Sequence, residues 1–262
     1  MPKNSSPHIY THLARYYDRF FTFHPYWFRA ARQKLLRKIL TQVHTVCDLA
    51  CGTGTTALEL AQLGMSVYGV DLSPTMCRLA RAKVRRAGAD VTIFQGDMRA
   101  FRLPRPVDLI TCEYDALNHV PRRTDLRRVA KAVARALRPG GYFYFDVNNR
   151  LAFKKIWSGS AWKEKPGVGM LTRGRYDQRR GTGAMDVDWF VRQQGGWRRF
   201  HEHVEQVAWT RAEIVQALRA EGFHRIQSRD AAALFRGDSK MVPGSRTFYV
   251  AQRISTDTDR DR

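Results

Sequence analysis

The sequence has few cysteines, no long apolar segment and no evident metal-ligand motif. Its four cysteines, Cys47, Cys51, Cys77 and Cys112, form no C-x-x-C pair, which favours buried free thiols over a disulfide framework or a zinc site. No apolar run approaches the roughly 18 residues of a membrane helix. The N-terminus, MPKNSSPHIY, lacks an apolar signal core. We therefore expect a cytoplasmic protein without a membrane partner and without a bound metal.

Negative charge is also scarce, because 45 Lys and Arg face 24 Asp and Glu and the net charge is +21. Such an excess can indicate a polyanionic partner such as RNA. However, the arginines are scattered along the whole chain, and no aromatic-interleaved basic block resembles an RNA-recognition strand. A solvated basic surface is the favoured interpretation, and nucleic acid is the less favoured partner.

Hydrophobic residues make up 44% of the chain, which is enough for a sizeable core. Strand-like runs (VHTVCDLA, SVYGVDLS, VTIFQGD, VDLITCEYD and YFYFDVNN) alternate with helix-like runs (TTALELAQLG, PTMCRLARAKVRRAG and DLRRVAKAVARALRPGG). A later helix, TRAEIVQALRAEGF, precedes two closing strands, HRIQSRD and RTFYVAQR. This order predicts an α/β, Rossmann-like fold with a seven-stranded, mostly parallel sheet and helices on both faces.

The pattern changes between residues 151 and 208. MDVDWFVR alternates with period two and WRRFHEHVEQVA has extended character, so we expect a three-stranded antiparallel insertion that forms a cap. The aromatic stretch YTHLARYYDRFFTFHPYWF predicts a helical lid near the N-terminus. The predicted organisation is a lid over 1–40, a core over 41–150, a cap over 151–208, completion of the core over 209–254 and a flexible tail over 255–262.

One stretch, VCDLACGTGTTALELA, places an acid before a glycine turn and a helix. Gly52, Gly54 and Ala57 match the dinucleotide fingerprint G-x-G-x-x-A. Asp48, at the end of the preceding strand, would repel a pyrophosphate bound at that helix N-terminus. A ligand with a positive amine and no phosphate fits better, and S-adenosylmethionine has both properties. A nicotinamide dinucleotide is the alternative.

Acids recur at the ends of the predicted strands. Right-handed crossovers bring the C-terminal ends of parallel strands to one edge, where Asp48, Asp71, Asp97 and Glu113 would meet. A carboxylate at Asp71 can accept both ribose hydroxyls, and one at Asp97 can accept from an adenine amino group. The walls for the adenine ring would then come from Met98 on one side and from Leu72 and Met76 on the other.

The motifs VCDLACGTGTTALELAQLG, VYGVDLS, VTIFQGDMRAF, VDLITCEYDALNHV and LRPGGYFYFDVNN resemble those of class I S-adenosylmethionine-dependent methyltransferases. The resemblance covers roughly residues 40 to 150. LACGTG and YYDRFF are most similar to the branch of glycine-type and sugar-amine N-methyltransferases. The resemblance implies that Tyr17 is a lid tyrosine and that Glu113 contacts the cofactor mainly through its backbone. The other residues that it places in the cofactor site are Asp48, Ala50, Gly52, Asp71, Asp97 and Met98.

The acceptor is less defined. The resemblance places Asp115 and Asn118 at the floor of the substrate pocket and Tyr17 in its lid, and Tyr114 is a further pocket candidate because it adjoins Asp115. The catalytic candidates are Asp115 and His119. An amine acceptor needs no base once it is neutral, whereas a hydroxyl benefits from one. His201 and His203 share a strand face with Arg199 and Glu205, which we expect to be solvated.

The predicted function is methyl transfer from S-adenosylmethionine to a small-molecule amine or hydroxyl. The alternatives are an RNA or protein methyltransferase, a NAD-binding oxidoreductase and a non-catalytic cofactor-binding scaffold. The sequence leaves the oligomeric state open, with a homodimer as one option.

Overall fold

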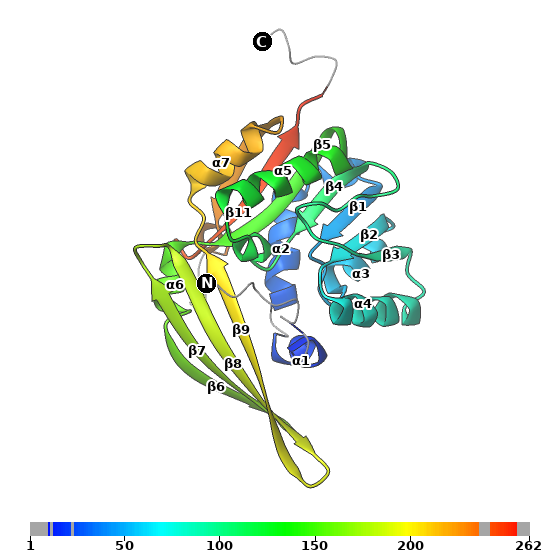
Figure 1. The fold of residues 1–262 in the computed structure, drawn as a ribbon. Helices are drawn as coiled ribbons and strands as arrows, with labels where there is room; N and C mark the ends of the chain where they lie inside the picture. The colour runs from blue at the N-terminus through cyan, green and yellow to red at the C-terminus, as the bar shows by residue number, and fades with distance from the viewer. Residues whose placement is uncertain (1–9, 11–12, 22–23, 236–241, 256–262) are drawn as a thin grey trace.

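A seven-stranded sheet forms the centre of the protein (Figure 1). In this computed structural model its order is β10-β11-β5-β4-β1-β2-β3. The strands are β1 (Thr45–Leu49), β2 (Ser66–Asp71), β3 (Val91–Gln95), β4 (Val107–Cys112), β5 (Leu137–Asn148), β10 (Phe223–Asp230) and β11 (Arg246–Arg253). Only the pairings of β11 with β5 and with β10 are antiparallel within this sheet. The strand order reverses between β1 and β4, where ligands bind in open α/β sheets.

The structure describes residue 10 and residues 13–21, 24–235 and 242–255. The first nine residues of the predicted lid and residues 256–262 of the predicted tail lie outside the described residues. The helices are α1 (Leu13–Phe20), α2 (His24–Leu36), α3 (Thr55–Gln62), α4 (Pro74–Arg86), α5 (Arg123–Ala136), α6 (Arg150–Lys155), α7 (Arg211–Arg219) and α8 (Ala231–Leu234). Two short 3-10 turns are η1 (Leu40–Gln42) and η2 (Ala116–His119). The predicted fold class, with its antiparallel insertion, is confirmed.

Local sequence explains where the helices begin. Ser73 accepts a hydrogen bond from the Met76 amide and Pro74 occupies the first turn of α4, where the lack of an N–H costs nothing. Thr210 and Glu213 form a reciprocal capping box at the start of α7. These caps fix the ends of helices that cover opposite faces of the sheet.

The antiparallel insertion contains four strands, so the prediction of three was wrong. They are β6 (Gly159–Lys165), β7 (Val168–Asp177), β8 (Thr182–Gln193) and β9 (Gly196–Val207), paired in sequence order. The missed strand, β6, is an edge strand whose residues are all exposed. It therefore lacks the alternation of apolar and polar residues that identifies a half-buried strand.

The helix α5 ends at Ala136, although we predicted that it would run to Pro139-Gly140-Gly141. These three residues belong to β5. The pairing of β4 with β5 shifts register between Val107 and Leu109, and a proline is tolerated in a strand at such an irregularity. Gly141 allows close approach there, since a Cβ would lie 3.0 Å from the Asp108 carbonyl oxygen.

The inner face of the four-stranded sheet packs on α1. Trp189 of β8 is fully buried, with Tyr16 stacked on it at 5.7 Å between ring centroids and Phe20 edge-on at 5.2 Å. Figure 1 shows α1 between this sheet and α4, beyond the C-terminal ends of the central strands. α1 and the four-stranded sheet therefore cover the C-terminal edge of the central sheet, where the predicted site residues lie.

Candidate active site at the C-terminal edge of the sheet

The turn between β1 and α3 has left-handed backbone at three positions. Ala50, Gly52 and Gly54 have φ of 58°, 54° and 79°, a conformation that is costly for residues with a Cβ. A Cβ on Gly54 would lie 3.0 Å from that of Ala80 on α4, whereas one on Gly52 would have no neighbour within 4 Å. Gly54 thus permits helix packing, while Gly52 leaves room for a ligand beside the backbone. We call residues 50–54 the glycine turn.

Asp71, at the end of β2, is tied to the glycine turn. Its Oδ2 accepts from the Gly52 amide at 2.9 Å and its Oδ1 accepts from the Ser73 amide at 2.8 Å. Burial raises its pKa, and these two amides oppose the rise. Each oxygen retains acceptor capacity, so the carboxylate fits the predicted role of binding a pair of hydroxyl groups.

Asp48, at the end of β1, is 2% exposed. Its Oδ1 accepts from the Thr111 hydroxyl at 3.0 Å, and its Oδ2 has no hydrogen-bond partner within the described part of the chain. Burial, reinforced by repulsion from Glu113, raises its pKa to about 8, against the opposing effects of Thr111 and Arg32. A nearby cationic amine would stabilise the ionised form of Asp48. The amino group of S-adenosylmethionine fits this requirement.

This raised pKa predicts a pH-linked affinity. At pH 6 the free protein holds Asp48 protonated, and binding of a cationic amine beside it must release that proton. The affinity for S-adenosylmethionine should therefore rise between pH 6 and 7.5 by up to about tenfold for each pH unit. Calorimetry at both pH values in two buffers of different ionisation enthalpy measures the affinity and the proton release.

Asp48→Asn is the control for this pH effect. The amine of the ligand itself titrates near 8, and that contribution is common to both proteins. In the variant, the affinity should change with pH only as the ligand amine dictates, and the release of the Asp48 proton on binding should disappear. An identical pH dependence in the two proteins would show that Asp48 does not titrate with binding.

The third acid, Asp97, is held by Arg99. The Nε atom of Arg99 lies 3.0 Å from both carboxylate oxygens. Burial raises the pKa of Asp97, but the hydrogen bonds from Arg99 outweigh burial and lower it overall. Of the predicted ring contacts, Met98 is partly buried, Met76 is 3% exposed and Leu72 is 59% exposed. Asp97 is thus ionised and oriented near the end of β3.

The Glu113 side chain faces the helices. It is buried, accepts from Arg32 at 2.7 Å and from the Thr56 hydroxyl at 2.9 Å, and Arg32 also binds Glu59 at 2.6 Å. Any contact with a cofactor would therefore use the Glu113 backbone, as the family resemblance implies. Arg32 was not predicted as a site residue, because its only signal in the sequence is a basic residue on the apolar face of α2.

A polar cluster joins the central sheet to the four-stranded sheet. We call it the core–cap cluster, and its members are Tyr10, Asp115, His119, Asp146, Gln206 and Arg246. Asp115 accepts from Arg246 at 2.7 Å and from the Gln206 amide at 2.7 Å. Arg246 also donates to Asp146, and the Asp115 amide donates to Asp146 at 3.0 Å. The structure thus brings together both predicted catalytic residues.

His119 lies at the other side of this cluster. Its Nε2 is 2.9 Å from the Tyr10 hydroxyl and 3.0 Å from the Gln206 amide nitrogen. Burial lowers the pKa of His119, although Asp115 opposes this. At neutral pH the His119 imidazole is therefore uncharged. Burial also raises the pKa of Asp146 to about 7, against the effect of Arg246.

Two predicted pocket residues have other contacts. The Asn118 amide donates to the carbonyls of Asn148 and Val207, and its oxygen accepts from the Asn148 amide. It thereby fastens η2 to the ends of β5 and β9. Tyr114 stacks on Phe28 with 4.0 Å between ring centroids, on the α2 side of the sheet.

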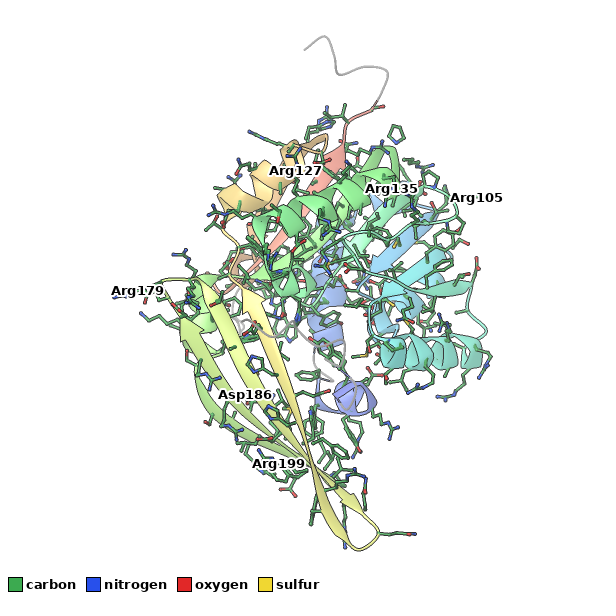
Figure 2. All side chains as sticks on the ribbon, in the orientation of Figure 1. Arg105, Arg127, Arg135, Arg179, Asp186 and Arg199 are labelled. Atoms are coloured by element: carbon green, nitrogen blue, oxygen red, sulfur yellow. The ribbon has the colours of Figure 1, made fainter. Side chains whose placement is uncertain are left out.

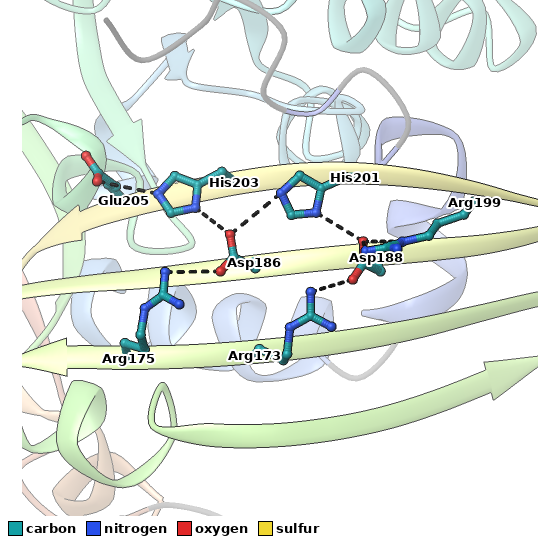
Figure 3. Close-up of polar contacts among 8 residues, drawn as sticks. All are labelled: Arg173, Arg175, Asp186, Asp188, Arg199, His201, His203 and Glu205. Carbon is teal, nitrogen blue, oxygen red and sulfur yellow. Dashed lines mark hydrogen bonds and ion pairs between the residues drawn. The ribbon is translucent and has the colours of Figure 1, made fainter. Parts of the chain in front are cut away.

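His201 and His203 lie on the outer face of the four-stranded sheet (Figure 3). His201 contacts Asp188 at 3.0 Å and His203 contacts Asp186 at 2.7 Å. Their side chains are 49% and 41% exposed, and their contacts are separate from the core–cap cluster. Basic and acidic side chains alternate across β7, β8 and β9 on this face. The other members of this row are Arg173, Arg175, Arg199 and Glu205.

The basic residues are widely distributed. Figure 2 labels Arg105, Arg127, Arg135, Arg179 and Arg199 on separate parts of the molecule. Several are paired, as in the ion pairs of Arg127 with Glu221 and of Arg199 with Asp188. Within the described residues, no helix is both long and apolar enough to cross a membrane.

Comparison with known proteins agrees with this geometry. Residues 46–141 match a family model described as a methyltransferase domain. YqeM of Bacillus subtilis, a candidate methyltransferase by name, is 27% identical over 254 residues, covering 95% of this chain and 98% of its own. A dTDP-4-amino-2,3,4,6-tetradeoxy-D-glucose N,N-dimethyltransferase of Saccharopolyspora spinosa is 37% identical over 108 residues, 41% of this chain and 42% of its own.

An ubiquinone biosynthesis O-methyltransferase of Pectobacterium carotovorum is 31% identical over 134 residues, 50% of this chain and 54% of its own. The chain thus spans about half the length of these last two relatives. Among solved structures, an S-adenosylmethionine-dependent methyltransferase of Clostridium acetobutylicum has a TM-score of 0.77, 24% identity and coverage of 94% and 99% of the two chains. CalS10, an amino pentose methyltransferase of Micromonospora echinaspora solved with bound S-adenosylmethionine, has a TM-score of 0.63, 24% identity and coverage of 87% and 91%.

The strand order, the glycine turn and the domain match together define a class I methyltransferase. The protein is an S-adenosylmethionine-dependent methyltransferase, and S-adenosylmethionine is its cofactor. The predicted family, enzyme class and cofactor are confirmed, and the dinucleotide alternative is not supported. The individual roles of the site residues stay predictions.

Proposed function

We propose that the protein transfers the methyl group of S-adenosylmethionine to an amine of a small molecule in the cytoplasm. The observation that carries this proposal is the core–cap cluster, which lies between the two sheets and is partly to fully buried. Asp146 is 0% exposed and Gln206 is 3% exposed. A cluster enclosed in this way suits a small acceptor better than a macromolecule, and sugar-amine and ubiquinone methyltransferases among the relatives support a small acceptor.

The charge of the cluster favours an amine. Two carboxyl groups, those of Asp115 and Asp146, share the single guanidinium of Arg246, so the cluster has an uncompensated negative charge whenever Asp146, whose pKa burial raises to about 7, is ionised. A cationic ammonium would compensate that charge, whereas a neutral hydroxyl would not. Asp115 is therefore proposed to bind the ammonium form of the acceptor.

An ammonium must lose a proton before its nitrogen can attack. Burial lowers the pKa of His119 and leaves its imidazole uncharged, and its Nε2 faces the Tyr10 hydroxyl and the Gln206 amide. The proton can therefore reach Nε2 through Tyr10, whose O–H passes its own proton to Nε2 as the hydroxyl oxygen takes the one from the ammonium. When bound, S-adenosylmethionine supplies a methyl group on a cationic sulfur. The remaining contribution of the chain is alignment and exclusion of water by α1 and the four-stranded sheet.

The proposed cofactor contacts are Asp48, Ala50, Gly52, Gly54, Asp71, Leu72, Met76, Asp97, Met98 and the Glu113 backbone, with Tyr17 over the site and beside the acceptor. Tyr17 lies beside Tyr10 of the core–cap cluster, with 6.5 Å between the ring centroids, which fits this place. Tyr114 and Asn118 are proposed to shape the pocket mainly by holding its walls.

A methyl-transfer assay with paired amine and hydroxyl acceptors tests the proposal. Amines should be the substrates. Asp115→Asn should raise KM for the amine at least about tenfold and leave S-adenosylmethionine affinity within about twofold, because one charge contact is lost. His119→Gln should lower kcat about tenfold and remove one limb of the pH profile.

His203→Gln is the matched control, since this half-exposed histidine lies on the outer face of the four-stranded sheet. It should leave kcat and KM unchanged. Methylation of hydroxyl acceptors alone, or equal rates in wild-type protein and Asp115→Asn, would contradict an amine acceptor. Tight tRNA binding that disappears between about 50 and 200 mM salt would instead support an RNA substrate.

A further inference from the structure

A hydrogen-bonded cluster connects α1 to the glycine turn. Asp18 of α1 accepts from the Thr53 hydroxyl through Oδ1 at 2.7 Å and from the Lys83 ammonium through Oδ2 at 2.7 Å. Lys83, on α4, also donates to the Thr53 hydroxyl at 3.0 Å and to the Thr55 hydroxyl at 2.7 Å. Four side chains from three segments thus share one network, which we call the Asp18 latch.

The position of the latch relates it to the cofactor site. Thr53 stands between Gly52 and Gly54 in the glycine turn, and α1 contributes to the cover that leaves Thr53 only 5% exposed. Thr55 is the first residue of α3. On its other side α1 is fixed to the four-stranded sheet, through the stacking of Tyr16 on Trp189. The latch is therefore the polar attachment of α1 to the turn that binds the cofactor.

Electrostatics explains why Asp18 belongs at this place. The N-terminus of a helix carries partial positive charge, so the Lys83 ammonium beside the first residue of α3 is unfavourable by itself. Asp18 compensates both the ammonium and the helix end. An isolated exposed ion pair would contribute little, but here the pair is hydrogen-bonded to a buried hydroxyl.

We infer that the Asp18 latch controls the dissociation of S-adenosylmethionine. Asp18 and Lys83 are positioning residues, which hold α1 against the glycine turn while cofactor is bound. Release of the cofactor requires these hydrogen bonds to open. The inference rests on the S-adenosylmethionine site at this edge of the sheet and adds to it a determinant of residence time.

Stopped-flow displacement tests this inference. Protein loaded with S-adenosylmethionine is mixed with excess S-adenosylhomocysteine, and dissociation is followed by tryptophan fluorescence. Asp18→Asn should raise the dissociation rate on the order of tenfold, with a small change in the association rate, as is usual when a contact is lost. Lys83→Met should raise it less, because Asp18 keeps Thr53 and the helix end as partners.

The charge-exchanged protein, Asp18→Lys with Lys83→Asp, should recover part of the slow dissociation, whereas Asp18→Lys alone should not. Arg15→Gln, an exposed change on α1 outside the latch, is the matched control. Rates within twofold of that control in Asp18→Asn would overturn the inference. So would an unchanged rate accompanied by a lower melting temperature of the free protein, since the latch would then only stabilise the fold. Absence of S-adenosylmethionine binding by the wild-type protein would refute the site itself.

Discussion

Arg32→Met is expected to lower the free energy of unfolding by about 3–5 kcal/mol, the cost of breaking a buried ion pair. The Arg32 side chain is 2% exposed and that of Glu113 is 1% exposed, with 2.7 Å between the paired atoms. Arg32 also binds Glu59 at 2.6 Å. Among the residues that the structure describes, its removal leaves the buried Glu113 carboxyl with the Thr56 hydroxyl as its remaining side-chain partner. Urea denaturation followed by circular dichroism measures the change.

Two variants test this explanation. Arg32→Met with Glu113→Gln should recover much of the lost stability, because no uncompensated charge remains in the interior. Arg29→Met removes the other guanidinium bound to Glu59, at 2.5 Å, but that side chain is 55% exposed, so the loss should be below about 1 kcal/mol. Equal losses in Arg32→Met and Arg29→Met would refute a special role for the buried pair.

Asp71→Ala is expected to weaken S-adenosylmethionine binding about 100-fold or more. The carboxylate is the proposed acceptor for two ribose hydroxyls, and a hydrogen bond to a charged group contributes about 1.5–3 kcal/mol. The change also frees the amides of Gly52 and Ser73, which loosens the glycine turn. Isothermal calorimetry gives the affinity, and thermal unfolding shows whether the free protein remains folded.

Asp90→Ala is the matched control for Asp71→Ala. Asp90 is an exposed aspartate of the α4–β3 connection, and it accepts from Ser66. Its loss should leave the affinity unchanged. Asp71→Asn, which keeps one acceptor oxygen, should bind with intermediate affinity. Equal affinity in Asp71→Ala and wild-type protein would exclude Asp71 from the cofactor site.

Local patterns in the sequence predict most of the central sheet. The central strands β1 and β4 are buried on both faces, so they are mostly apolar runs that the sequence displays directly. The limits of prediction lie where no such run exists. β6 is exposed along its whole length, and the Pro139-Gly140-Gly141 stretch, typical of a helix stop, lies within β5 because a register shift accommodates it.

The acids of the proposed cofactor site could be predicted because each one lies at or near the C-terminal end of a strand. Asp48 and Asp71 are the fourth residue of β1 and the last of β2, and right-handed parallel connections bring such ends together whatever the details of packing. By itself the sequence therefore determined the central sheet, the glycine turn and S-adenosylmethionine as the cofactor.

The partners of two other acids, Asp115 and Asp18, were decided by the tertiary structure alone. Arg246 is 131 residues from Asp115, Gln206 is 91 residues from it, and Lys83 is 65 residues from Asp18. No periodicity relates positions so far apart. Their contacts depend on the antiparallel return of β11 beside β5, on the seat of the four-stranded sheet and on the placement of α1. Burial then sets their protonation, because the pKa of a carboxyl or an imidazole responds to the surrounding dielectric and charges, which only the folded chain defines.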